Sequence, residues 1–492
     1  MPRRRPSLVL ASILAGGLVL TPAPSATAAA APPAFTVEPL YDIEPTGEPW
    51  FFPVCPVPIP ECPPSQGAYV RQLTTFGDLA VFTAFDFDHG EEVWATDGTP
   101  EGTRLVIDLC PGPCFSRPEI LGRVGGKLLF SASATSPHGG FRLWATDGIE
   151  VHAIGVDELR PWYASPDAID GWLYFSLGNS VWRSDGADLE PALDIPDPSS
   201  SRVVIQLFGI GSRAFARRLG SLSAPDDLWE ILPTSREVLR GCTPSDWISE
   251  VAVLGDAAYF GARCVDGLSD LGPGLFRTDG SPGGTVRIRT FENGPPSFLL
   301  PTAREIFFLE GAMGSNGTPI YRIWRTDGTA AGTVRLTGFF PWLRMQLALG
   351  DRYLLFSTIN QLHALDLTTG AIADLPIPPS GLVTADPSGS FALVGGRNGW
   401  WVTYGTPAQT FQVFTANPQA PSPLSAAVFL GVRAVFSGEH GVDGEDLWVM
   451  GLPTALDIPV LGWPGVLLLA LLLAAAALRS LSRRHPVATR SG

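Results

Sequence analysis

The hydrophobic positions of this chain fall in short runs that are separated by turns. Residues 120–156 show the pattern most clearly, with runs at 120–126, 127–134, 141–146 and 151–156. Each run is rich in β-branched, aromatic or alternating side chains, and glycine, proline or Asp-Gly stands between the runs. The pattern predicts four short strands per unit, which is the construction of a β-propeller blade.

A repeat sets the spacing of these units. Residues 94–98 read Trp-Ala-Thr-Asp-Gly, and a large aromatic residue followed by Asp-Gly returns four more times. Weaker copies keep only the large residue. The marker residues of all copies are Trp94, Trp144, Trp182, Trp229, Phe276, Trp324, His363, Trp401 and Trp448. Neighbouring markers are 38 to 50 residues apart, a period typical of propeller blades or solenoid units.

This period predicts an all-β fold, a single large β-propeller of about 8–9 four-stranded blades over residues 32–455. The marker residue is expected in the third strand, packed between neighbouring blades. Residues 35–45 look like a fourth strand without the three before it, whereas the last unit, 426–451, lacks a fourth strand. We therefore predict that the N-terminal strand completes the last blade and closes the ring, leaving no exposed sheet edge.

The Asp-Gly pairs after the markers predict turns, because glycine adopts positive φ freely and a short Asp side chain accepts hydrogen bonds from backbone amides. A second glycine, Gly102 in the first copy, is expected to return the chain to the sheet. We interpret the turn residues as structural: Asp97, Gly98, Asp147, Gly148, Asp185, Gly186, Asp279, Gly280, Asp327 and Gly328. The alternative is a ring of carboxylates that holds Ca²⁺, which needs several oxygens on one ion.

The two ends of the chain carry targeting features. Residues 1–31 combine three arginines, an apolar run and small residues, as in a secretory signal peptide. Residues 456–492 hold an apolar stretch without charge from Ile458 to Leu478, followed by arginines, which predicts a membrane-spanning helix with a cytoplasmic tail. With its Ile-Pro start at residue 458, this segment resembles bacterial C-terminal sorting signals of the IPTL type. Both readings imply an exported protein at the cell envelope or cell surface.

Charge and cysteines narrow the partners and the compartment. The chain has 33 basic and 48 acidic side chains, a net charge of −15, so nucleic acid is not an expected partner. The six cysteines form three pairs by position: Cys55 with Cys62, Cys110 with Cys114, and Cys242 with Cys264. An even count in an exported chain favours disulfides, although zinc binding by Cys110 and Cys114 is an alternative.

The repeated motif resembles that of the bacterial ELWxxDGT repeat proteins, in which units of this kind recur along exported chains. The clearest copy is residues 93–103, Val-Trp-Ala-Thr-Asp-Gly-Thr-Pro-Glu-Gly-Thr. The resemblance extends over about residues 67–451. It implies a propeller and a surface location, and it supplies no catalytic residue.

One loop class carries candidate chemistry. Histidines precede the marker strand in the first and last units, close to several acidic side chains. These units are neighbours in a closed ring, so their loops would meet on one rim and bind a metal ion or act as acid and base. The candidate residues are Asp86, Asp88, His89, Glu439, His440 and Asp443. The alternative is that His-Gly belongs to the repeat and lies on solvated loops.

No local motif of a hydrolase, a zinc protease or a phosphate-binding loop occurs in the sequence. Our first interpretation is therefore a non-catalytic, envelope-exposed propeller that binds a protein or glycan through rim loops. A secreted propeller enzyme acting on extracellular glycans and a structural surface protein without a specific ligand are the alternatives. We expect a monomer, a membrane contact through the C-terminal helix, and no cofactor unless the acidic turns bind Ca²⁺.

Overall fold

A computed structural model describes residues 35–43, 67–112, 114–134, 140–155, 161, 164–165, 167–177, 180–193, 203–220, 224–231, 235–243, 247–265, 272–377, 382–396, 399–413, 422–440 and 444–452. Strands dominate these residues, with one single-turn 3-10 helix, η2 Pro407–Gln409. The strands form nine separate antiparallel sheets. The described part of the chain is therefore an all-β, nine-bladed propeller, within a compact unit of Ala34–Thr454.

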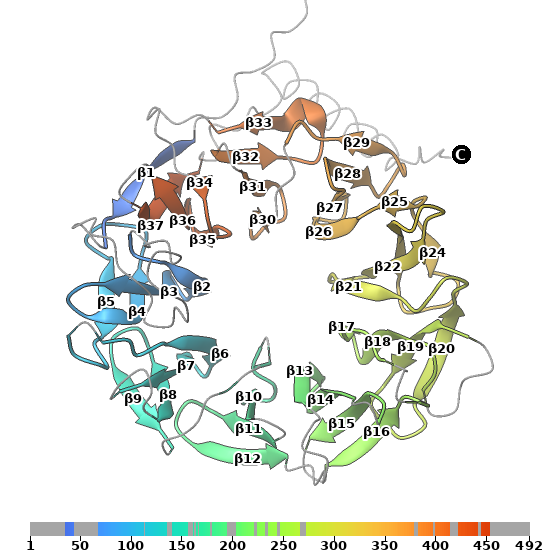
Figure 1. The fold of residues 1–492 in the computed structure, drawn as a ribbon, viewed down its shortest axis with the longest axis horizontal. Coiled ribbons are helices and arrows are strands. Elements are labelled where there is room, and N and C mark those ends of the chain that lie inside the picture. Colours follow the sequence, from blue (N-terminus) through green and yellow to red (C-terminus); the bar gives the residue numbers. More distant parts are fainter. Residues whose placement is uncertain are drawn as a thin grey trace, which may run out of the picture. The chain divides into compact units, whose positions relative to one another are not determined.

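The blades follow one another along the chain, and each begins with its innermost strand (Figure 1). Blades 1 to 3 are β2 Arg71–Phe76, β3 Leu79–Asp86, β4 Gly90–Thr96, β5 Arg104–Ile107; β6 Glu119–Val124, β7 Lys127–Ser133, β8 Phe141–Thr146, β9 Val151–Ile154; and β10 Leu173–Leu177, β11 Ser180–Ser184, β12 Leu189–Leu193. Blades 4 to 6 are β13 Val203–Ile210, β14 Arg213–Leu219, β15 Asp227–Ile231, β16 Arg236–Arg240; β17 Ala252–Leu254, β18 Ala257–Ala262, β19 Gly274–Thr278, β20 Thr285–Thr290; and β21 Ser297–Pro301, β22 Ile306–Met313, β23 Pro319–Thr326, β24 Val334–Arg335, β25 Phe340–Pro341.

Blades 7 to 9 complete the ring. They are β26 Arg344–Leu349, β27 Tyr353–Ser357, β28 Leu362–Asp366, β29 Ile372–Asp374; β30 Leu382–Ala385, β31 Ala392–Gly396, β32 Gly399–Thr403, β33 Thr410–Gln412; and β34 Ser422–Pro423, β35 Val428–Leu430, β36 Arg433–His440, β37 Gly444–Gly451 with β1 Thr36–Tyr41. The units around Trp229, His363 and Trp401 each build a four-stranded sheet. The count among the described residues is therefore nine rather than eight.

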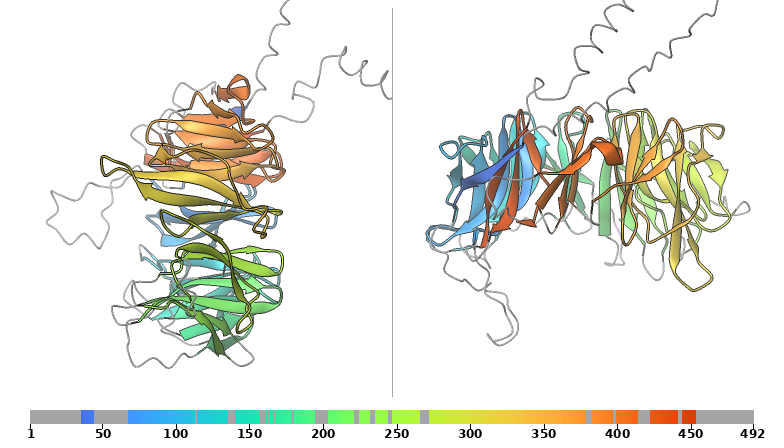
Figure 2. Two further views of the ribbon diagram at one scale, coloured as in Figure 1. Left: turned by 90° about the vertical axis from the view of Figure 1, so that its right-hand side faces the viewer. Right: turned by 90° about the horizontal axis from the view of Figure 1, so that it is seen from above.

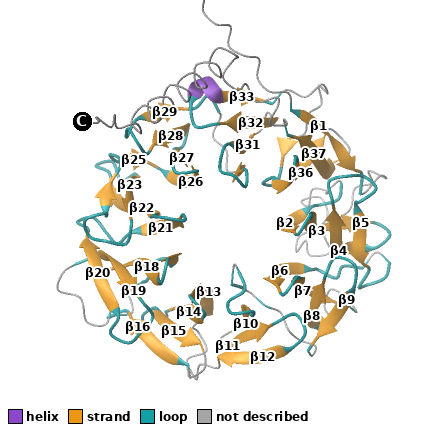
Figure 3. Cartoon of the chain, turned by 180° about the vertical axis from the view of Figure 1, so that it is seen from behind, coloured by secondary structure: helices purple, strands orange, loops and turns teal. Residues whose placement is uncertain are grey.

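Seen from the side, the strands of the unit run between two faces (Figure 2). In a four-stranded antiparallel blade, the first turn and the third turn emerge on one face. The second turn and the connection to the next blade emerge on the other. Viewed from behind, the loops therefore gather at the ends of the strands around the ring (Figure 3). We call the side that carries the Asp-Gly turns the Asp-Gly face and the other side the opposite face.

The predicted closure of the ring is confirmed. Strand β1 pairs antiparallel with β37, with Thr36 opposite Gly451 and Val37 opposite Met450. Val37 packs into the apolar cluster shared with blade 8, and Leu40, 3% exposed, packs into the cluster shared with blade 1. One N-terminal strand thus supplies buried apolar surface to both interfaces of blade 9.

The markers pack between blades and lie in the third strand, as predicted, except in blade 3, where three strands are described and Trp182 lies in the second, β11. Trp94 in β4 belongs to a cluster with Val435 and Leu447 of blade 9. Trp324 in β23 packs with Tyr259 and Leu275 of blade 5. Burial of such large side chains is the main favourable contribution to the stability of a core. The repeat period therefore reflects one interblade contact per blade.

The Asp-Gly turn is held by a repeated set of hydrogen bonds. Asp97 Oδ1 accepts from the backbone N–H of Thr99 at 2.9 Å and from its hydroxyl at 2.6 Å. Thr96 Oγ1 accepts from the N–H of Gly98 at 3.0 Å and lies 2.8 Å from Thr103 Oγ1. Residues 326–333 repeat these contacts. The Thr99 hydrogen bonds lower the pKa of Asp97, because they stabilise the ionised carboxyl.

The glycine of this turn packs against the preceding blade, which leaves no room for a side chain. Gly328 has a φ of +93°, and a Cβ there would lie 2.3 Å from the hydroxyl of Tyr259 in blade 5. Gly280 of blade 5 meets Phe215 of blade 4 in the same way, at 2.4 Å. Arg213 donates to the carbonyl oxygens of Asp279 and Gly280 at 3.0 and 2.7 Å. The turn is therefore a joint between blades as well as a change of direction.

The second glycine of the motif was expected to return the chain to the sheet. The structure gives another reason for a glycine at this position. Gly102 lacks a positive φ. A Cβ on Gly102 would lie 2.1 Å from Asp97 Oδ1, and one on Gly332 would lie 2.0 Å from Asp327 Oδ1. The residue is glycine because the Asp carboxylate occupies the space that a side chain would fill.

Two of the three predicted disulfides are confirmed, Cys110–Cys114 and Cys242–Cys264. Cys55 and Cys62 lie outside the described residues, as do the predicted signal peptide, residues 1–31, and the C-terminal segment, residues 456–492. Within the described ranges, no helix is long and apolar enough to cross a membrane.

Deleting Thr36–Tyr41 is expected to lower the melting temperature by on the order of 10 °C or more, since it exposes an edge of β37 and two apolar clusters. Scanning calorimetry measures this. A synthetic peptide of residues 35–43 should restore part of the loss. A melting temperature equal to that of the intact chain would contradict the role of β1 in closure.

Gly332→Ala is expected to lower the free energy of unfolding by roughly 1–3 kcal/mol, because the new Cβ displaces the Asp327 carboxylate from its hydrogen bonds. Gly338→Ala is the matched control, since a Cβ at Gly338 meets no atom within 4 Å. In the double variant Asp327→Ala/Gly332→Ala the two losses should not add. Additive losses in urea denaturation would show that the clash with Asp327 is not the cause.

Candidate functional site

The predicted His-Asp loop of blade 1 forms the turn between β3 and β4. The His89 Nδ1 atom lies 2.8 Å from Asp86 Oδ2, and the His89 backbone N–H donates to Asp86 Oδ1 at 2.6 Å. The hydrogen bond with Asp86 raises the pKa of His89, against an opposing effect of burial. Nearby Asp88 and Asp108 raise it further. The loop therefore favours a protonated imidazole paired with a carboxylate.

The corresponding loop of blade 9 lies between β36 and β37, where His440 is opposite Gly444 and Glu439 is opposite Glu445. Blades 9 and 1 share an apolar cluster, so these two turns occupy equivalent positions on neighbouring blades. Asp443 lies outside the described residues, as do the side chains of Glu439 and His440. The six-residue metal site stays a prediction. Among the described side chains, no three His, Cys, Asp or Glu come together as metal ligands.

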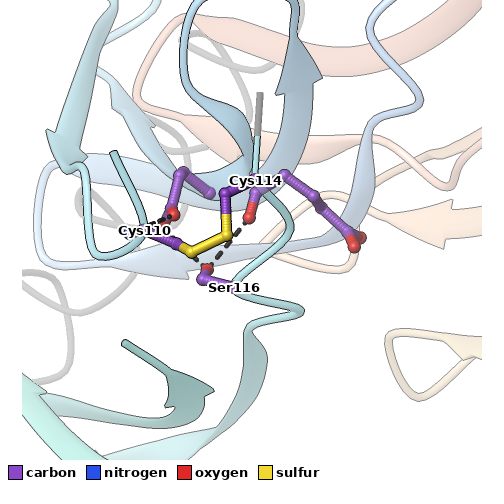
Figure 4. The surroundings of a disulfide bond; sticks show 5 residues. Cys110, Cys114 and Ser116 are labelled. Carbon is purple, nitrogen blue, oxygen red and sulfur yellow. Dashed lines mark hydrogen bonds between the residues drawn. A yellow bond between two sulfur atoms is a disulfide. The ribbon is translucent and has the colours of Figure 1, made fainter. Parts of the chain in front are cut away.

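A buried carboxyl beside the His89 loop of blade 1 was not predicted from the sequence. Glu92 is fully buried in β4. Its Oε1 accepts from the backbone N–H of Cys110 at 3.2 Å, and its Oε2 lies 2.7 Å from Ser116 Oγ. Figure 4 shows the disulfide between Cys110 and Cys114, with Ser116 beside it. Ser116 Oγ also donates to the carbonyl of Glu91 at 2.9 Å. Burial raises the pKa of Glu92 to about 8, although the hydrogen bonds limit the rise.

The Cys110–Cys114 loop fits closely over this carboxyl. Gly90 at the start of β4 has a φ of +76°, and a Cβ there would lie 1.5 Å from the carbonyl oxygen of Cys114. The sequence signal is the pair Glu91-Glu92 at the start of the third strand, directly before the apolar residues Val93 and Trp94. Because Glu92 has no exposed surface, its role is to fix the loop, and it does not reach a ligand.

A second area, on the opposite face, exposes large apolar side chains. We call Phe298, Met313, Phe339 and Trp342 the aromatic surface; their exposed fractions are 59%, 69%, 37% and 50%. All four surround the first half of β23. Met313 is opposite Pro319, and the Trp342 backbone N–H donates to the Pro319 carbonyl at 3.2 Å.

The remaining members of the aromatic surface contact the same strand. The ring of Phe298 lies edge-on to Tyr321, with centroids 6.4 Å apart. The guanidinium carbon of Arg322 lies 4.6 Å from the ring centre of Phe339. Side chains from β21, β22 and the segment around β25 therefore lie around the same part of β23.

The backbone forces two of these rings into solvent. Phe298 and Trp342 both have a φ of +53°. The strand pair β21 and β22 has a bulge between Ser297 and Leu300, which turns Leu299 inward and Phe298 outward. At the equivalent bulge of blade 1, Gln72, also at φ +53°, accepts a hydrogen bond from the N–H of Ile120 in blade 2.

Blade 6 thus differs from blade 1 at the same position of the fold. The bulge position of blade 1 holds a polar side chain that links two blades, whereas that of blade 6 holds Phe298, which is mostly exposed. An exposed aromatic ring contributes little burial, and non-glycine residues at positive φ cost free energy. An exposed aromatic ring at a strained backbone position indicates a binding surface.

Comparison with known proteins shows no family for this chain. No protein family matches the chain, and no curated protein matches it. Among solved structures, the computationally designed protein Ika8 is 15% identical with a TM-score of 0.42, over 75% of this chain and 99% of that one. A prolyl endopeptidase is 13% identical with a TM-score of 0.40, over 68% and 54%. This chain thus spans about half the length of that peptidase.

A further solved structure is the propeller domain of the Trilobed protease from Pyrococcus furiosus. It is 12% identical with a TM-score of 0.34, over 62% of this chain and 97% of that one. The TM-scores of these three structures are all below 0.5. The site must therefore be argued from this chain's own residues.

The free energy of unfolding should depend on pH because Glu92 is buried as a neutral acid. Because the pKa of Glu92 is about 8 in the folded state and 4.5 as its ordinary value, the folded state binds the extra proton between these pH values. The free energy of unfolding then falls as pH rises, by roughly 1.4 kcal/mol per pH unit in this window. Glu92→Gln, which resembles the neutral acid, should match the wild type near pH 4.5 and be more stable near pH 9.

Urea denaturation at several pH values measures the difference, with Glu101→Gln on an exposed turn as the control. Equal pH profiles for wild type and Glu92→Gln would contradict a buried neutral Glu92.

Proposed function

We propose that this chain is an exported, non-catalytic propeller that binds a glycan through the aromatic surface. The single observation that carries the proposal is the exposure of Phe298 and Trp342 at positions where the backbone turns their rings into solvent. The faces of a sugar ring carry C–H groups with partial positive charge, which pack on the negative face of an aromatic ring. Two rigid exposed rings suit this contact.

The composition of the surface favours a glycan over a protein partner. A stable protein interface buries about 800 Å² on each side around a continuous apolar centre. Here the Arg322 guanidinium packs on the ring of Phe339, and the polar Asn316 lies in the hairpin turn after Met313, which is the only aliphatic member of the four. Aromatic rings accompanied by polar groups match the alternation of C–H faces and hydroxyls on a sugar chain.

Location is part of the same proposal. The disulfides Cys110–Cys114 and Cys242–Cys264 suit an oxidising compartment outside the cytoplasm. Residues 1–31 as a signal peptide and 456–492 as an anchor or sorting signal, together with membership of the ELWxxDGT repeat proteins, remain our proposals from the sequence. A propeller held at the envelope would keep a bound polymer close to the cell.

Binding to a glycan array and calorimetry with the selected glycan would test the proposal. Trp342→Gly is expected to weaken binding at least tenfold while leaving the melting temperature unchanged or higher, because glycine adopts a φ of +53° without strain. Trp247→Ala is the control, since Trp247 is 45% exposed and lies on another part of the ring. Unchanged affinity of Trp342→Gly, or turnover of the glycan, would contradict the proposal.

A further inference from the structure

A cavity of about 520 Å³ lies between blades 5 and 6, next to the aromatic surface. Its wall comes from the end of β20, from the middle of β22 and β23, and from β24. The lining residues used below are Arg289, Glu292, Glu310, Arg322, Trp324 and Arg335. Three arginines around one cavity are unusual in a chain whose net charge is −15.

The floor of the cavity is a closed hydrogen-bond network. Glu310 is fully buried and accepts from Arg322 Nε at 2.7 Å and Nη2 at 3.0 Å. It also accepts from Trp324 Nε1 at 2.8 Å and from Asn293 Nδ2 at 2.8 Å. Burial opposes ionisation of Glu310, but these hydrogen bonds outweigh it and lower its pKa. Glu310 and Arg322 therefore cancel in charge and keep each other in place.

The other two arginines, Arg289 and Arg335, have no carboxylate partner of this kind among the described residues. Arg289 lies with its guanidinium carbon 4.8 Å from the ring centre of Trp324 and donates through Nη1 to the carbonyl of Thr333 at 2.8 Å. This contact orients the guanidinium, and its Nε and Nη2 have no protein acceptor among the described residues. Arg335 is opposite Trp324 across the strand pair and is exposed. In the described part of the chain, no hydrogen bond or ion pair engages Arg335.

The charges decide which ligand fits. With Glu310 and Arg322 cancelled, Arg289 and Arg335 contribute two positive charges and Glu292 one negative charge. These three side chains have a net charge of +1, which suits a ligand group with a single negative charge. Guanidinium groups bind the oxygens of such a group through paired, charge-assisted hydrogen bonds.

We propose that this cavity binds a monoanionic oxyanion, a carboxylate or a sulfate ester, carried on a sugar unit. The identity of the carrier as a sugar rests on the proposed function. Arg322 joins the two areas, because it lines the cavity and also lies over the ring of Phe339. A glycan on the aromatic surface therefore reaches the cavity, and the ligand class is an acidic glycan.

The experiment titrates the full-length protein with glucuronate, galactose 6-sulfate and galactose, observed by ligand NMR, and with polygalacturonate and a neutral polysaccharide, observed by calorimetry. Arg335→Ala is the main variant, since it breaks no contact among the described residues. Arg289→Ala/Arg335→Ala removes both charges. Arg304→Ala is the matched control, an exposed arginine paired with Asp351 at 3.0 Å.

Arg335→Ala should weaken binding of the charged monosaccharides at least fivefold, and the double variant should abolish it, while galactose shows no difference. Added salt should weaken the binding further. The relative affinities of glucuronate and galactose 6-sulfate assign the group as carboxylate or sulfate. Unchanged binding in Arg335→Ala, an equal loss in Arg304→Ala, or no binding of either charged sugar would overturn the inference.

The two proposals fail separately. If Trp342→Gly loses the neutral polysaccharide while Arg335→Ala keeps every ligand, the cavity inference falls and the proposed function stands. If glucuronate binding depends on Arg335 while no polysaccharide binds, the inference stands for the anion and the proposed function falls.

Discussion

Nine small sheets form one ring only if each keeps a fixed distance from the next, and in six blades a glycine in the turn before the outermost strand limits that distance. Five of these glycines belong to Asp-Gly, and Gly405 follows Tyr404. At Gly148, Gly186, Gly280, Gly328 and Gly405 the nearest side chain belongs to the preceding blade, and Gly98 meets Arg433 across the closure between blades 9 and 1. At Gly280, Gly328 and Gly405 a methyl group would lie 2.3 to 2.4 Å from an aromatic side chain of the preceding blade and would force the two blades apart. Large markers such as Trp94 and Trp324 then fill the space inside the joint.

Two glutamates show how the interior accommodates charge. Glu92 and Glu310 are both fully buried in strands, yet burial raises the pKa of one to about 8, whereas Arg322, Asn293 and Trp324 outweigh burial and lower the pKa of the other. Glu310 has a cation, Arg322, as a hydrogen-bond partner, whereas Glu92 has none among the described residues. Glu92 has a hydroxyl and a backbone amide as partners, whose hydrogen bonds favour the ion but do not outweigh burial. The first glutamate fixes a loop, and the second builds the floor of a charged cavity.

The sequence predicts the features that repeat. The four-strand unit, the marker between blades and the strand that closes the ring all follow from local patterns or from the period. His363 shows the limit of the motif, because a histidine takes the marker place and is held by Asp374 at 2.8 Å. The aromatic surface was not predictable, since a bulge at Phe298 and a positive φ at Trp342 decide where those rings point. Nor was the cavity, because Arg289 and Arg335 are far apart in sequence and meet only through the packing of two blades.

The position of β37 between β1 and β36 has a mechanical consequence. Both neighbours are antiparallel to it; β36 pairs with residues 444–451 and β1 with residues 447–451. A pull on the chain at residue 452, directed along the strand, would load the hydrogen bonds of both neighbours at once in shear rather than one after another. Because one of those neighbours comes from the other end of the unit, the force passes into both ends of the ring together. Blade 9 therefore acts as the clasp of the ring, and tension from a tether would be shared before any single blade opened.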